Sequence, residues 1–313
     1  MMNATRNRPE VLATGAAVVT VLLWASAFVA IRRAGEAYSP GALALGRLAS
    51  GALALGVIWA IRREGLPPRE AWRGILLSGV LWFGFYMVVL NWGEQQVDAG
   101  TAALVVNVGP LLIALLGTRL LGDPMPPRLL AGMAVSFAGA VTVGLSMSGG
   151  GGNSLLGVVL CLLAAVAYAG GVVAQKPALG HGSPLQVTTF GCLVGAVGCL
   201  PFAGQLVHQA AHAPLPATLD MLYLGVFPTA LAFTTWAYAL ARRTASRMGA
   251  TTYAVPGLVV LMSWLVLGEV PGVLTLAGGV LCLAGVAVSR SQAGGSRVVR
   301  VAAGERPRSE KAG

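Results

Sequence analysis

Most of this chain consists of long apolar runs in which charged residues are almost absent. Of its 313 residues, 56% are hydrophobic and only 10% are charged, whereas a soluble domain carries about 25% charged residues. The runs are close to the roughly 20 residues that a helix needs to cross the ~30 Å hydrocarbon core of a membrane. A membrane β-barrel would instead show alternating segments of about 10 residues. The sequence therefore predicts an all-α integral membrane protein.

Charged and polar residues divide the chain into ten apolar runs, each of which we expect to form a transmembrane helix. The runs cover roughly residues 11–31, 40–61, 72–92, 100–120, 128–147, 154–175, 184–207, 218–241, 247–268 and 271–289. Residues 207–220 separate two of them and contain His208, His212, Pro214 and Pro216. Two prolines and two histidines in so short a stretch favour a loop.

The second half of the chain repeats the first half with an offset of 146 residues. The offset places Pro110 on Pro256 and Asp123 on Glu269, and the similarity around these positions has no gaps. Ungapped similarity of this length indicates a duplicated unit. Each copy holds five expected helices, which is an odd number, so the second copy must enter the membrane from the opposite side. We therefore expect ten transmembrane helices arranged as two inverted five-helix repeats.

The repeat also sets the expected boundaries within the chain. They are a cytoplasmic N-terminus over residues 1–10, a first five-helix repeat over 11–147, a Gly-rich linker over 148–153, a second five-helix repeat over 154–290, and a basic cytoplasmic tail over 291–313. The composition of the tail, which is polar and charged, is typical of a disordered segment.

Basic residues are distributed very unevenly between the alternate loops of this arrangement. With the N-terminus in the cytoplasm, 18 of the 21 Lys and Arg residues fall on the cytoplasmic side, Arg32 and Arg33 fall outside, and Arg47 lies within a helix. Positive residues accumulate in cytoplasmic loops, so we expect a multi-pass protein of the cytoplasmic membrane with both termini inside. The net charge of +10 is explained by this topology, and scattered basic residues without a reading module do not indicate nucleic-acid binding.

Several classes of function find no support in the sequence. Cys161, Cys192, Cys199 and Cys282 all lie within expected helices, and no Cys/His cluster has metal-ligand spacing, so we expect no metal and no other cofactor. A P-loop is absent, which excludes an ATP-driven pump for this chain alone. The alternative to transport is an integral-membrane enzyme acting on a lipid-linked substrate. Such an enzyme needs a nucleophile or an acid–base pair, and none is visible.

Several short motifs mark the successive runs. They are Leu23-Trp24-Ala25-Ser26-Ala27-Phe28 in the first run, Pro40 and Arg47 in the second, Asn107-Val108-Gly109-Pro110-Leu111 in the fourth, and a Leu-Gly-Asp/Glu plus a Leu-Ala-Gly pair near the end of each copy. As an ordered set they resemble the EamA-type transporters of the drug/metabolite transporter superfamily. The resemblance implies a secondary transporter that is not an enzyme and that exports or takes up a small solute, often an amino acid or another metabolite. Its expected partners are that solute and membrane lipid, and a monomer is compatible with them.

Polar and aromatic residues inside the expected helices are candidates for a substrate cavity. The set is Trp24, Ser26, Tyr86, Asn107, Tyr168, Trp236 and Tyr253. A cavity between two repeats needs a few such groups to orient a solute among apolar walls. For each residue singly, packing between helices explains its presence equally well.

Pro110 and Pro256 occupy equivalent positions in the middle of two expected helices. A proline removes one backbone hydrogen bond and kinks a helix. Because the repeat pairs the two prolines, we expect them to act as hinges or to line the cavity. The alternative is a static kink that neighbouring helices relieve.

Arg47 is the charged residue that lies deepest in an expected helix. A charge near the bilayer centre costs at least about 2.5–3.5 kcal/mol. Arg47 either binds an anionic group of the substrate, such as a carboxylate, or it bonds to a neighbouring helix or reaches the interface. No carboxylate lies deep in an expected helix, and Glu94, Asp98, Asp123 and Glu269 are at helix ends. The sequence therefore does not support proton coupling.

Overall fold

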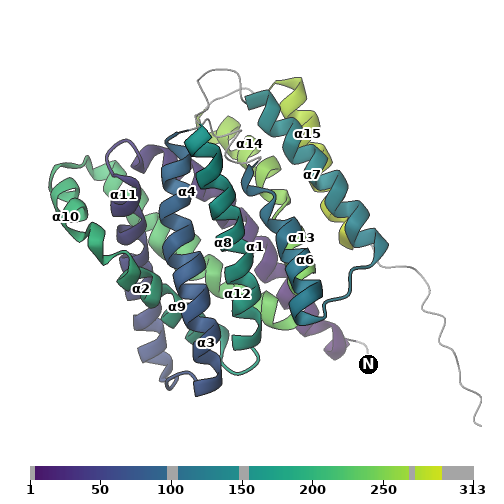
Figure 1. Ribbon diagram of the computed structural model, residues 1–313, viewed down its shortest axis with the longest axis horizontal. Coiled ribbons are helices and arrows are strands. Elements are labelled where there is room, and N and C mark those ends of the chain that lie inside the picture. The colour runs from purple at the N-terminus through teal and green to yellow at the C-terminus, as the bar shows by residue number, and fades with distance from the viewer. Residues whose placement is uncertain (1–3, 97–104, 148–154, 268–271, 291–313) are drawn as a thin grey trace, which may run out of the picture.

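The computed structural model of the protein is built of helices joined by short connections (Figure 1). It describes residues 4–96, 105–147, 155–267 and 272–290. All regular secondary structure in these ranges is helical, which confirms the all-α prediction for the described residues. The expected linker at 148–153 and the expected tail at 291–313 lie outside them, as do Asp98 and Glu269.

The first half of the chain forms helices that lie close to the expected runs. They are α1 (Ala4–Ala34), α2 (Pro40–Arg62), α3 (Arg69–Ser78), the π-helix η1 (Gly79–Phe85), α4 (Tyr86–Glu94), α6 (Gly109–Leu121) and α7 (Pro127–Met147). α3, η1 and α4 follow one another without a break and make one continuous segment. α2 begins at Pro40, because a proline in the first helical turn has no N–H bond to lose there.

The second half of the chain also has only helical secondary structure in the described residues. Its helices are α8 (Leu155–Ala178), α9 (Pro184–Gly198), the short 3-10 helix η2 (Leu200–Phe202), α10 (Ala203–His212), α11 (Leu215–Leu224), the π-helix η3 (Gly225–Leu231), α12 (Ala232–Arg242), α13 (Ala245–Thr251), α14 (Ala254–Leu267) and α15 (Val273–Arg290). The second π-helix begins at Gly225, 146 residues after Gly79 opens the first one. Wide π-turns are rare in proteins and occur often at functional sites.

Five helical segments are long and apolar enough to cross a membrane. They are Pro9–Ala34, Pro40–Arg62, Arg69–Glu94, Leu155–Ala178 and Leu215–Arg242. α9 and α10 are bent by 52° where they meet and would add a sixth segment if the pair counts as one span. Large apolar side chains such as Leu53, Ile61 and Val166 are exposed on the outside of the bundle, where lipid can cover them. The chain is therefore a multi-pass membrane protein.

The prediction of a loop at residues 207–220 is wrong. α10 continues to His212 and α11 already begins at Leu215. Pro214 is the residue that precedes α11, and Pro216 lies in the first turn of that helix. Both positions suit proline, because the N–H groups of a first turn have no partner within the helix. The two prolines mark the start of a helix and not a long connection.

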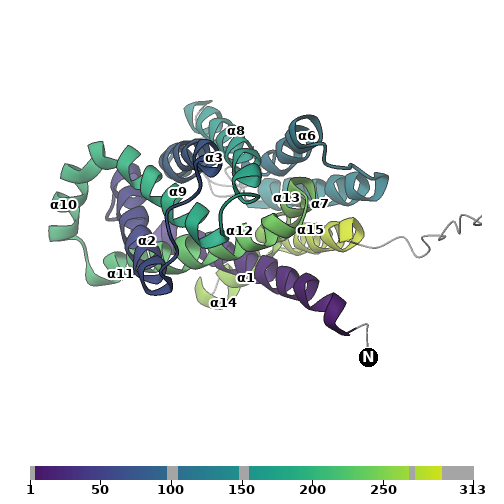
Figure 2. The same ribbon diagram turned by 90° about the horizontal axis from the view of Figure 1, so that it is seen from below.

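α7 and α15 lie side by side at one end of the bundle, and α10 lies at the opposite end (Figures 1 and 2). The pair is antiparallel, since Gly132 of α7 packs against Gly285 of α15 whereas Gly139 packs against Gly278. A Cβ atom added to Gly132 or Gly139 would lie 2.6 Å from a backbone oxygen of the other helix. Small residues at this crossing therefore allow the two backbones to approach closely.

Candidate functional site

Aromatic side chains from five helical elements meet in one cluster inside the bundle. The cluster contains Trp24 of α1, Trp82 of η1, Tyr86 of α4, Tyr168 of α8, and Phe233 and Trp236 of α12. Neighbouring ring centroids are between 4.6 and 5.8 Å apart, which is the spacing of favourable aromatic pairs. Four of the seven predicted cavity residues, from helices far apart in sequence, belong to this aromatic cluster.

The aromatic cluster also carries polar groups. The indole N–H of Trp24 donates to the backbone carbonyl of Pro228 at 3.2 Å, and the Tyr168 hydroxyl donates to Thr252 Oγ1 at 3.5 Å. The indole N–H of Trp236 is buried and has no hydrogen-bond partner among the residues that the structure describes. A buried donor without a partner carries a free-energy penalty. The cluster therefore offers at least one unused donor in addition to apolar surface.

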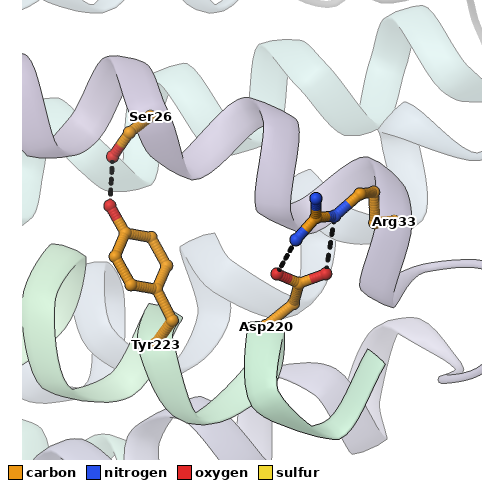
Figure 3. Close-up of polar contacts among 4 residues, drawn as sticks. All are labelled: Ser26, Arg33, Asp220 and Tyr223. Carbon is orange, nitrogen blue, oxygen red and sulfur yellow. Dashed lines mark hydrogen bonds and ion pairs between the residues drawn. The ribbon is translucent and has the colours of Figure 1, made fainter. Parts of the chain in front are cut away.

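Ser26 does not join the aromatic cluster. Its hydroxyl lies 2.6 Å from the hydroxyl of Tyr223 on α11, close to an ion pair between Arg33 and Asp220 (Figure 3). Side chains two residues apart on an α-helix are rotated by about 200° around the helix axis, so they point to nearly opposite sides. Trp24 and Ser26 therefore face different neighbours, and the structure brings only Trp24 to the cluster.

Tyr253 and Asn107 also lie apart from the aromatic cluster. Tyr253 is fully buried in a separate apolar cluster with Ala114, Leu129 and Met133. It directly follows Thr252, the partner of Tyr168, so it lies beside the aromatic cluster and not within it. Asn107 is half-buried and belongs to a two-residue turn that precedes α6.

Pro110 and Pro256 lie in the first turn of a helix and not in a helix interior. A two-residue turn precedes each of these helices, at 107–108 before α6 and at 252–253 before α14. The helical structure is thus interrupted shortly before each proline, so the N–H group that proline lacks removes no helical hydrogen bond. The two interruptions occur at nearly equivalent places in the two halves, and the role of the prolines as hinges stays a prediction.

Arg47 is buried, with a relative exposure of only 6%. Its Nε donates to Thr229 Oγ1 of η3 at 3.1 Å, which is one form of the predicted bond to a neighbouring helix. The guanidinium also interacts electrostatically with Glu94. A guanidinium has five N–H donors in a fork that matches a carboxylate, and the bond to Thr229 uses one of them.

Glu94 was expected to lie at the end of a helix, and it is the last residue of α4. Its Oε1 atom is nevertheless buried, and no hydrogen-bond partner for that atom occurs in the described ranges. The carboxylate interacts electrostatically with Arg47 of α2 and Arg32 of α1. Sequence reasoning missed this residue because a helix end is normally exposed. The available signal was that Glu94 and Arg47 fall toward the same side of the expected membrane.

A shallow groove of 280 Å³ opens elsewhere on the bundle, between α2, α9 and the segment of η3 and α12. Its lining is Ala54, Leu55, Ile58, Arg62, Leu185, Val226, Phe227, Ala230, Leu231 and Thr234. The groove contains none of the predicted cavity residues, and its walls are almost entirely apolar. A surface of this composition suits lipid better than a polar solute.

The four cysteines are all buried as free thiols. Within the described ranges, no group of three or more His, Cys, Asp or Glu side chains is arranged to hold a metal ion. Among the described residues, the aromatic cluster and the two charged groups beside it are candidates to engage a solute.

Comparisons with known proteins show that the chain is similar to members of one transporter family. The sequence profile of the EamA-like transporter family matches the chain twice, at residues 12–145 and 155–291. A "Probable terminal-alkyne amino-acid exporter" of Streptantibioticus cattleyicolor is 36% identical over 274 residues, which cover 88% of this chain and 92% of the relative. A "Probable amino-acid metabolite efflux pump" of Escherichia coli is 23% identical over 282 residues, which cover 87% and 93%. A solved crystal structure with 24% identity has the same fold, with a TM-score of 0.73 over 88% of this chain and 97% of that one.

Proposed function

Since the chain belongs to the EamA-like transporter family, we propose that it exports an amino acid or a similar small metabolite across the cytoplasmic membrane. Membership confirms the family predicted from the motifs, and it makes the chain a transporter of small solutes and not an enzyme. The two relatives named for amino-acid export support the substrate class and the direction. The observation that carries the proposal is the aromatic cluster, because it joins residues from both halves of the chain at one place.

The proposed architecture is ten transmembrane helices in two inverted repeats. The family profile matches two successive stretches of similar length, which supports two copies. Helical segments 146 residues apart also have the same internal structure, since α3 followed by η1 corresponds to α11 followed by η3. Grouping the broken helices as single spans gives five spans before residue 148 and five after residue 154.

The contact between α7 and α15 supports the inversion. The Ser136 hydroxyl donates to the backbone carbonyl of Cys282. Cys282 lies 146 residues after Ser136, so it is the residue that matches Ser136 in the second repeat. On either side, Gly132 meets Gly285 and Gly139 meets Gly278, so each contact has a mirror contact with the partners exchanged. Reciprocal contacts between antiparallel equivalent helices are what a two-fold axis perpendicular to those helices produces. Such an axis lies in the membrane plane when the helices span it.

In this proposal, the solute binds between the repeats and the two halves rock around it. The aromatic cluster forms one wall of the site, with Ser26, Asn107 and Tyr253 near its margins. Pro110 and Pro256 would be the hinges, because each follows an interruption at which a helix can change direction. Both termini lie in the cytoplasm, as the distribution of basic residues predicts.

Counterflow in liposomes tests the transport proposal. Purified protein is reconstituted, the vesicles are loaded with one unlabelled L-amino acid, and uptake of the labelled amino acid is followed with and without a pH gradient. We expect counterflow of at least one amino acid and a clear loss in Trp236→Phe, with Trp92→Phe as the control because Trp92 is 45% exposed. Absence of counterflow for a full panel of amino acids and nucleobases would contradict the proposal.

Cysteine labelling in intact cells tests the proposed orientation. Glu36→Cys and Gly65→Cys place reactive thiols in the first two connections, both at exposed positions, while the four natural cysteines are buried. A membrane-impermeant maleimide should label residue 36 in intact cells and residue 65 only after the cells are opened. The opposite pattern would overturn the orientation without affecting the family assignment.

A further inference from the structure

Two opposite charges lie inside the bundle without touching each other. Arg47 on α2 is 6% exposed, and the Oε1 atom of Glu94 on α4 is buried. They interact electrostatically, yet no ion pair within 4.0 Å joins them. An ion pair that the described residues do form joins Arg33 of α1 and Asp220 of α11 instead. A donor-rich cation and a carboxylate with an unused acceptor therefore lie in the same region of the bundle without pairing.

Two charged groups that lack partners inside a protein are unfavourable unless a ligand supplies the missing partners. Burying a charged group away from water carries a large free-energy penalty when the group is not paired and hydrogen-bonded. Thr229 satisfies only Nε of Arg47. A ligand that brings an anion to Arg47 and a cation to Glu94 would satisfy both groups at once.

We propose that Arg47 binds the carboxylate and Glu94 the ammonium group of a zwitterionic α-amino acid. The inference rests on the proposed export function and assigns the residues that recognise its substrate. An α-amino acid carries both charges on one carbon atom, so a single compact molecule can bridge two protein charges that do not reach each other. A guanidinium binds a carboxylate through two parallel hydrogen bonds, and a carboxylate with a free oxygen accepts from an ammonium group.

Tyr86 connects this charged pair to the aromatic cluster. It lies on α4, the helix that ends at Glu94, and its ring centroid lies 5.8 Å from that of Tyr168. Tyr168 in turn lies 5.4 Å from Trp82. The side chain of a bound amino acid would therefore face aromatic rings, which favours apolar side chains. An ammonium group near the face of Tyr86 would also gain cation–π attraction.

The test combines ligand analogues with matched variants of the full-length protein. The probes are L-phenylalanine and L-leucine, their α-amides, which lack the carboxylate, and their N-acetyl derivatives, which lack the ammonium. Binding to protein in detergent is followed by the fluorescence of the buried tryptophans. The wild type should bind each amino acid roughly 10- to 100-fold more tightly than either analogue, the range expected for one charged hydrogen-bonding group.

Each variant should lose its selectivity against one of the two analogues and keep its selectivity against the other. Arg47→Gln should bind the amino acid and its amide about equally while still rejecting the N-acetyl derivative. Glu94→Gln should show the reverse pattern. Arg69→Gln and Glu70→Gln are the controls, because both residues are exposed at the start of α3, and they should match the wild type. Thermal unfolding of every variant shows whether it is folded, and the ratio between analogues does not depend on the fraction of active protein.

Three results would overturn the inference. The first is a wild type that binds neither amino acid, the second is one that binds the analogues as tightly as the amino acids, and the third is variants that weaken all ligands equally. Counterflow of some other metabolite together with one of these results would remove the zwitterion site and leave the export function standing. Absence of counterflow for every solute would remove the export function itself.

Discussion

Two helix pairs of the molecule share one geometry and differ in their chemistry. In the first pair, α2 starts after Ser39 and packs against the π-helix η3. In the second pair, α9 starts after Ser183 and packs against the π-helix η1. Both α-helices open with proline, and both π-helices are seven residues long. The comparison therefore concerns side chains that stand at matching positions of the same framework.

The first pair holds a charge where the second holds an aromatic ring. Arg47, seven residues after the opening proline of α2, hydrogen-bonds to Thr229. The matching residue of α9 is Gly191, and the ring of Phe83, which matches Thr229, lies over it, 3.2 Å from where a Cβ would be. The second pair shows that this packing forms without any charge. Arg47 is therefore not required by this packing, which is compatible with the role in substrate recognition that we propose for it.

The largest effect on stability should follow from removing the aromatic ring of Phe83 from the second helix pair. Phe83 is fully buried, so Phe83→Ala should lower the free energy of unfolding by about 3–5 kcal/mol, the usual result of truncating a core aromatic. Denaturant unfolding in detergent measures this. The control is Phe85→Ala in the same π-helix, because Phe85 is 45% exposed and its loss should change stability by roughly 0.5 kcal/mol or less. Equal losses for the two variants would contradict a packing role for Phe83.

Removing one hydroxyl from the first pair should affect both stability and transport. Thr229→Val keeps the shape of the side chain but leaves Nε of Arg47 without its partner, which should destabilise the protein by about 1.5–3 kcal/mol. The freed guanidinium can also turn away from the substrate, so we expect the KM of counterflow to rise roughly 10-fold for such a loss.

A threonine of the second pair provides the matched control. Thr189 of α9 is buried, and its hydroxyl has no partner among the described residues. Thr189→Val should leave KM unchanged and should keep or raise stability, since removing an unsatisfied polar group relieves its desolvation penalty. An identical rise in KM for both threonine variants would mean that Arg47 has no special relation to the substrate.

Helices were predictable from sequence because their cause is local. An apolar run of about 20 residues must be helical in lipid, and α2 and α8 lie within a few residues of the expected runs. The π-helices η1 and η3 were not predicted, since they depend on contacts with helices far away in the chain. Pro214 and Pro216 were misread because proline breaks a helix interior but starts a helix equally well.

The candidate site was predictable by residue type and not by direction. Trp24 and Trp236, which were chosen as interior aromatics, meet in the structure, whereas Ser26 lies on another face of the helix that carries Trp24. Glu94 was not chosen because it ends a helix, yet one oxygen of its carboxylate is buried. The burial of a helix end depends on the helices that surround it, and a single sequence does not specify them.

A polar contact at a helix terminus should have a smaller effect than either pair. Asp123 Oδ2 accepts from the backbone N–H of Ser246 at 3.1 Å, near the start of α13. Asp123→Ala should lower stability by about 1 kcal/mol, as loss of a helix cap does, and Asp123→Asn should retain most of it. Selectivity between an amino acid and its amide should not change in either variant. A loss of selectivity would mean that any polar contact between the halves, and not Arg47 in particular, determines recognition.

The smallest effect should come from the exposed charged contact between the halves. Arg33 and Asp220 form a two-point ion pair, with side-chain exposures of 53% and 9%, beside the Ser26–Tyr223 contact (Figure 3). Water screens a pair that is half exposed, so a double-mutant cycle of Arg33→Gln and Asp220→Asn should give a coupling of roughly 1 kcal/mol or less, falling further as salt is added. Arg47 and the Oε1 atom of Glu94 are buried, and the equivalent cycle on ligand binding should therefore be larger and less dependent on salt. If both cycles gave small couplings with the same salt dependence, burial would not distinguish the two sets of charges, and the proposed substrate site would lose its physical basis.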